Sequence, residues 1–155
     1  MPPLQQADSL SDTTWKRRVC LLVMGQPAAK QGDKVVAVDT HIVMVQAGPS
    51  QVPTPLPHPF MGLLDGGLSS DVKIMGLPAA VLGSTASNTP SHIPMAPGLS
   101  FQKPPSNKAT IQIGSPTVLI NGKQAARNGD TATTCNDPAD LPAGKVIAIG
   151  TVFIG

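Results

Sequence analysis

The sequence has few of the side chains that build large cores or exposed helices. Among its 155 residues there are three Phe, one Trp and no Tyr, and all nine acidic residues are Asp, so Glu is absent. Large aromatic side chains supply much of the buried area in most domains, so the core of this protein must be thin. Because Glu is missing and Lys and Arg are few, the usual exposed helix formers are scarce and helix is disfavoured.

The modest charge and the short apolar runs exclude further classes of protein. The net charge is only +2, and no basic stripe is interleaved with aromatic residues, so nucleic-acid binding is not expected. The basic cluster at 15–18 precedes an apolar run of only seven residues, which does not favour a cleaved signal peptide. No apolar stretch approaches the roughly 20 residues that span a bilayer. Cys20 and Cys135 are expected to be free or metal-bound rather than paired in a disulfide.

The sequence is instead rich in proline, with 17 residues, and in glycine, with 15. It also contains three similar copies of one nine-residue segment. The three copies read GQPAAKQGD at 25–33, GLPAAVLGS at 76–84 and GKQAARNGD at 122–130. Apolar runs precede them at 19–24, 71–75 and 116–121. The pattern predicts three repeats of strand, turn and short Ala-rich segment, with motifs near 24–33, 75–84 and 121–130. Because each repeat is too small to bury its own apolar face, we expect the three to surround a pseudo-threefold axis.

The fold class that follows is mainly β, made of short strands and ordered loops with little helix. Unequal spacing between the copies makes a propeller a poor alternative. The proline-rich spacers at 46–62 and 96–109 favour ordered coil, because proline presets the backbone and removes donors. Residues 1–18 lack periodicity and are predicted to be an N-terminal arm to a domain at 19–155.

The histidines indicate a metal site. His41 lies fourteen positions after Pro27, and His92 lies fourteen positions after Pro78, so the two occupy the same point of their repeats. Cys135 follows the third motif, and equivalent positions converge on the axis. His58 is the one remaining histidine and has no place in the repeats.

Three imidazoles and a thiolate suit a closed, structural Zn²⁺ site, with Fe²⁺ as the less favoured ion. One ion would tie together loops of a small domain that has little apolar area. The alternative is that each His is an ordinary solvated or hydrogen-bonded residue.

The tetrapeptides PAAK (27–30), PAAV (78–81) and QAAR (124–127) resemble the PAAR motif, as do PAAKQGD, QAARNGD and the closing GTVFIG. This motif defines the spike-tip proteins of contractile injection machines, which include type VI secretion systems and phage-like particles. The resemblance implies a small conical β fold with a zinc ion near its apex, held by His41, His58, His92 and Cys135. No copy reads Pro-Ala-Ala-Arg here, since the fourth residue is Lys30, Val81 or Arg127. We therefore expect the motif to serve turn geometry and packing rather than a fixed arginine contact.

The resemblance also implies a role and partners. The broad base would cap a trimeric β-helical spike, one tip per trimer, through the strands beside the motifs and residues 145–155. The opposite end would meet a target membrane transiently. Effector cargo is a further possible partner, and no homo-oligomer is expected. Such a chain would be made and assembled in the bacterial cytoplasm and delivered outward on the machine, without a signal peptide.

Two other functions are weighed against a structural tip. One is an injected effector with its own activity, which is disfavoured because residues 1–18 are too few for an enzyme domain and no Ser has the context of a nucleophile elbow. No catalytic residues are therefore assigned, and we expect no enzyme. The other is a stand-alone zinc-binding module, which the His and Cys residues alone would support.

Overall fold

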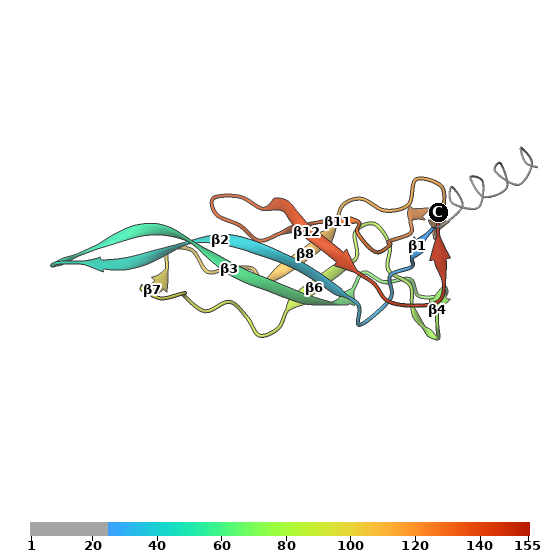
Figure 1. Ribbon diagram of the computed structural model, residues 1–155, viewed down its shortest axis with the longest axis horizontal. Helices are drawn as coiled ribbons and strands as arrows, with labels where there is room; N and C mark the ends of the chain where they lie inside the picture. Colours follow the sequence, from blue (N-terminus) through green and yellow to red (C-terminus); the bar gives the residue numbers. More distant parts are fainter. Residues whose placement is uncertain (1–24) are drawn as a thin grey trace, which may run out of the picture.

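The computed structural model describes residues 25–155, which form strands, turns and ordered loops (Figure 1). These residues contain no helix, so within them no helix is long and apolar enough to cross a membrane. The mainly β fold predicted from composition is confirmed. The predicted arm at 1–18 and the predicted strand at 19–24 lie outside the described residues.

Six antiparallel strands pair in sequence until the sheet closes on itself. Each of the three repeats supplies one pair, and β12 pairs with β2 to complete the cylinder. The β3–β6 and β8–β11 pairings join the first repeat to the second and the second to the third. The six strands are β2 (Lys34–Ala47), β3 (Ser50–Gly66), β6 (Thr85–Asn88), β8 (Lys108–Ile111), β11 (Thr131–Thr134) and β12 (Leu141–Ile147).

The cylinder has a broad end and a long projection. The broad end carries three two-stranded pairs, one beside each Ala-rich motif, and the chain's C-terminus (Figure 1). At the opposite end β2 and β3 extend as a hairpin, with β7 (Gly98–Phe101) paired to β2 near residues 43–45. The pairs at the broad end are β4 (Lys73–Ile74) with β5 (Leu77–Pro78), β9 (Leu119–Ile120) with β10 (Lys123–Gln124), and β1 (Gln26–Pro27) with β13 (Phe153–Ile154).

The Ala-rich motifs form a closed ring on the axis of the cylinder. Ala29 donates its N–H to the Ala126 carbonyl, Ala126 to the Ala80 carbonyl and Ala80 to the Ala29 carbonyl, with N···O distances of 2.9, 3.0 and 2.9 Å. All three residues are fully buried. Three backbones meet this closely only because the side chains on the axis are methyl groups. The ring shows that the three copies are related by a pseudo-threefold axis, as the repeated sequence predicts.

The fourth motif residue differs between the repeats, but its backbone makes the same contact in each. The N–H groups of Lys30, Val81 and Arg127 donate to the side chains of the residues three positions later, which are Asp33, Ser84 and Asp130. A glycine with a φ of +84° to +87° precedes each of these acceptors, where a side chain would strain the backbone. The expectation that the motif serves turn geometry is confirmed.

Removing one of these acceptors should weaken the fold measurably. Asp130→Ala is expected to lower the free energy of unfolding by about 1–2 kcal/mol, since it leaves the Arg127 N–H without its acceptor. Asp130→Asn keeps an acceptor oxygen and should recover part of the loss. Urea unfolding measures both, with the exposed Asp65→Ala as the matched control. Equal midpoints for Asp130→Ala and the unaltered protein would contradict this role.

The proline-rich segment at 46–62 is a strand over most of its length, so the prediction of coil there was wrong. In the register of β3 with β2, the N–H and C=O groups of odd-numbered β3 residues point away from β2. Met61, for example, donates its N–H to the Asn88 side chain and not to β2. Proline is tolerated in a strand at such outward positions, because no ladder hydrogen bond is lost. Four prolines occupy them in alternation, at 53, 55, 57 and 59. The second spacer, 96–109, contains β7 and then coil over 102–107.

Candidate metal centre

The cylinder positions the four predicted ligands from separate elements. His41 lies on β2 and His58 on the facing stretch of β3, while His92 lies in the loop after β6 and Cys135 directly follows β11. The three imidazole centroids are 4.8 to 5.7 Å apart, and the Cys135 Sγ lies 3.8 Å from His41 Nε2. The structure therefore brings together residues separated by almost a hundred positions. Their role as ligands stays a prediction.

A fifth residue, Asp39, belongs to this cluster and was missed in the sequence. One donor atom each from Asp39, His41, His92 and Cys135 lies within 4.8 Å of the others, and His58 is not part of that closest group. Asp39 is fully buried and its Oδ2 lies 3.5 Å from the Cys135 Sγ. The signal was the alternation of β2, because Asp39 and His41 are two positions apart and so face the same side.

His41 is held with one nitrogen facing the cluster. Its Nδ1 lies 3.3 Å from Asp137 Oδ2, which also accepts the Ile42 N–H at 3.0 Å. A carboxylate on one ring nitrogen fixes the tautomer and orientation of a metal-binding histidine. The other nitrogen, Nε2, lies 2.9 Å from His92 Nδ1. This arrangement has the outer-shell support that metal-binding histidines use.

His92 carries a polar atom that the protein does not satisfy. Its side chain is 2 % exposed, and its Nε2 has no hydrogen-bond partner among the described residues. The nearest acidic oxygen, Asp39 Oδ2, is 3.9 Å away. Burial, followed by the neighbouring His41, lowers the pKa of His92 and so favours the neutral imidazole. A neutral, buried ring nitrogen without a partner is a fitting ligand for a cation.

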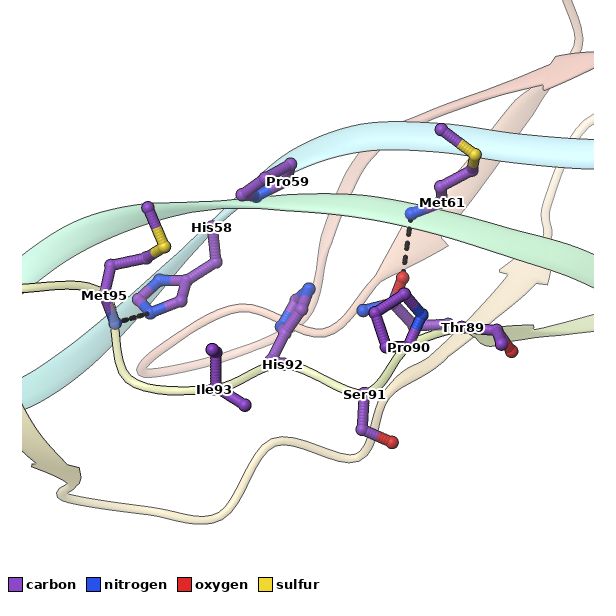
Figure 2. Close-up of a pocket in the computed structure, with 10 residues that line it drawn as sticks. His58, Pro59, Met61, Thr89, Pro90, Ser91, His92, Ile93 and Met95 are labelled. Carbon is purple, nitrogen blue, oxygen red and sulfur yellow. Dashed lines mark hydrogen bonds between the residues drawn. The ribbon is translucent and has the colours of Figure 1, made fainter.

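His58 is close to the cluster but has both ring nitrogens engaged. Nδ1 donates to the Leu56 carbonyl at 2.9 Å. Nε2 accepts the Met95 N–H at 3.1 Å (Figure 2). The Leu56 contact leaves Nε2 as the lone-pair nitrogen, which is the form that binds metals. Ligation by His58 would require the Met95 N–H to move away. In this structure Asp39 lies nearer to the other ligands than His58 does.

The buried acidic groups favour a cation here. Burial, and then the adjacent Asp39, raises the pKa of the Cys135 thiol. Asp39 has two stabilising contacts on its Oδ1, from the Thr134 hydroxyl and the Asn136 amide, but its nearest ion-pair partner within residues 25–155 is a histidine. A divalent cation would favour the thiolate and balance the carboxylate. The donor set therefore fits a metal ion, with imidazole and thiolate suited to zinc and similar metals.

Comparison with known families agrees with this geometry. Residues 66–139 match the family model described as PAAR motif, which confirms the resemblance predicted from the sequence. The matched range includes the second and third motifs, His92 and Cys135. No match was found among curated proteins. The match supports a spike-tip role in contractile injection systems, and the Asp, His, His and Cys cluster could hold a metal ion.

Proposed function

We propose, on the premise that residues 66–139 carry a PAAR motif, that this chain is the structural tip of a contractile injection machine. One copy would cap a trimeric β-helical spike, without forming a homo-oligomer of its own. The observation that carries this proposal is the Ala29–Ala80–Ala126 ring, which gives a single chain a threefold axis. A pseudo-threefold base can present three similar edges to a partner with true threefold symmetry.

The surface proposed to meet the spike is the broad end beside that ring. The three short strands that lie beside the motifs, β4, β9 and β13, and the residues next to them carry exposed apolar side chains, among them Leu119 at 63 % and Phe153 at 60 % exposure. Apolar patches of this kind on a small domain mark interaction sites. We name it the base surface, and its exposed apolar residues are Val72, Met75, Leu77, Leu119, Val152 and Phe153.

The metal ion would be structural in this role. His41, His92 and Cys135 would hold it, with His58 or Asp39 as the fourth ligand, and Zn²⁺ is the ion proposed over Fe²⁺. The bound ion would link β2, the loop after β6 and the segment after β11. We assign no enzymatic activity to the chain. We further propose that the chain is assembled onto the injection machine in the bacterial cytoplasm and delivered outward with it. Effector cargo is a further proposed partner.

Charge placed on the base surface should prevent spike binding. Leu119→Asp and Phe153→Asp are each expected to weaken binding at least about tenfold, because each puts a carboxylate in the apolar centre of the contact. Binding to a purified trimeric β-helical spike from the same organism, measured by interferometry, gives affinity, and light scattering of the complex gives its stoichiometry. Ile113→Asp, an exposed apolar position outside the base surface, is the control.

One copy per three spike chains is expected. No association of the unaltered chain with the spike would overturn the proposal and leave a stand-alone metal-binding module or an effector.

A further inference from the structure

The projecting end of the molecule is almost free of charge. No Lys, Arg, Asp or Glu occurs between Asp39 and Asp65, and none occurs between Lys73 and Lys103. The first stretch forms most of the β2–β3 hairpin, and the second includes β7 beside it (Figure 1). We define the tip ribbon as residues 38–61. Its one charged residue, Asp39, is fully buried in the cluster described above.

The outer face of the tip ribbon is apolar. Cross-strand pairs on this face join Val38 to Pro59, Ile42 to Pro55 and Met44 to Pro53. Val38 is 66 % exposed and the prolines of this face are exposed as well. A sheet face open to water normally carries polar side chains, but from 38 to 44 this face has only Thr40 among its β2 residues, and polar side chains return at Gln46 and Gln51 beside the turn. An exposed face of this composition indicates contact with something apolar.

Between residues 53 and 59 the free edge of the ribbon carries no backbone donors. Odd-numbered residues of β3 point away from β2, and those from 53 to 59 are all proline. A protein partner that added a strand here would need alternating donors and acceptors, which this edge does not offer. The edge would also leave no unpaired N–H group in a medium that lacks acceptors, where each such group is costly. Its carbonyl groups still need donors, so the depth that suits the edge is the interfacial region, where water is present.

Apolar surface continues from the ribbon onto the neighbouring loop. Ile93, 72 % exposed, and Met95 line a hollow of about 330 Å³ with Met61 of the ribbon (Figure 2). Pro59 of β3 and Pro90 of the loop also line this hollow, and no Lys, Arg or Asp lines it. Met side chains adapt their shape to irregular apolar partners. The hollow extends the uncharged surface beyond the two strands.

From these observations we infer that the tip ribbon binds phospholipid bilayers, entering their interfacial region through its uncharged outer face and its donor-free edge. The inference rests on the proposed function, since it names the element of the tip that meets the membrane. Because the ribbon has no exposed charge, recognition would depend on apolar contact and not on the charge of the lipid headgroups. A polybasic membrane-binding segment would behave in the opposite way.

Flotation of the full chain with vesicles tests the inference. The unaltered protein should partition onto vesicles of phosphatidylcholine alone and onto vesicles that also contain phosphatidylglycerol to a similar extent, with little effect of added salt. Val38→Asp and Pro55→Asp, both on the outer face, should each lower the partition coefficient about fivefold, since each replaces apolar surface with a charge near the lipid interface. Both positions are exposed, Val38 at 66 %, so the fold should tolerate the changes, and thermal unfolding checks this. Ile113→Asp is the matched control and should float like the unaltered chain.

Three outcomes would overturn the inference. The unaltered chain does not float with vesicles, both Asp variants float as well as the unaltered chain does, or binding requires phosphatidylglycerol and disappears in salt. The proposed function is judged separately, because the spike-binding assay depends on the base surface at the other end. If Val38→Asp binds the spike as the unaltered chain does but vesicle binding fails throughout, the tip function stands and the lipid contact does not. If vesicles bind as expected and the spike does not, the lipid contact stands alone.

Discussion

His41→Ala is expected to abolish metal binding and to cause the largest loss of stability of any substitution in the cluster. A ligand present at about 1,000 times its dissociation constant contributes about 4 kcal/mol to the free energy of unfolding, and this would be lost. His41 Nε2 lies close to both His92 and Cys135, so the substitution removes the donor atom that adjoins both of these ligands. Metal content by mass spectrometry and thermal unfolding measure the two effects. Chelator added to the unaltered protein isolates the contribution of the metal from that of the imidazole.

The same measurements identify the fourth ligand. If His58 is the ligand, His58→Ala should lose affinity while Asp39→Asn keeps it, and the reverse result would assign Asp39. Co²⁺ substitution adds a spectrum that responds to the ligand set and not to stability alone. Unchanged metal content in His41→Ala, or an unaltered protein that binds no metal, would refute the site.

Ala80→Leu is expected to destabilise the protein by about 3 kcal/mol, because the ring has no room for a larger side chain. Ala80 is fully buried, and its backbone links Ala29 to Ala126 on the axis. A leucine there would have to separate the three backbones, which would break hydrogen bonds in all three repeats together. Urea unfolding followed by circular dichroism measures the loss. The exposed Ala143→Leu is the control for the change of residue type. A midpoint close to that of the control would show that the ring does not depend on small side chains.

The repeats were predictable because their signal is local. Each motif carries its own turn and its own pair of alanines, and equivalent positions of three similar repeats are expected to lie around one axis. The strand that completes the first repeat was not predictable in the same way. In the structure β13 pairs with β1, and Val152 accepts the Ala28 N–H just as Val72 and Val118 accept those of Ala79 and Ala125. That strand is supplied by residues more than a hundred positions away, and only the likeness of TVFI, DVKI and TVLI hints at it.

The ribbon and Asp39 were missed for a different reason. Proline is scored as a strand breaker because it removes a donor, yet at 53, 55, 57 and 59 the missing donor faces no strand. Whether a proline interrupts a strand depends on register, which follows from pairing with β2 and not from local sequence. Asp39 was overlooked because a carboxylate is common on surfaces, and only its place on the inner side of β2 makes it part of the cluster.

The pairing of β1 with β13 has a consequence for how the protein folds. Gln26 lies opposite Ile154, so the first and last described strands meet in one repeat. Contacts of such high sequence separation form slowly, because a long loop must close first. On the ribosome, the second and third repeats can pair their strands as they emerge, but the first repeat lacks its partner until residue 154 has been added. Until that moment β1 has no strand to pair with, so the ring of alanines and the closed sheet can form before the base surface is complete.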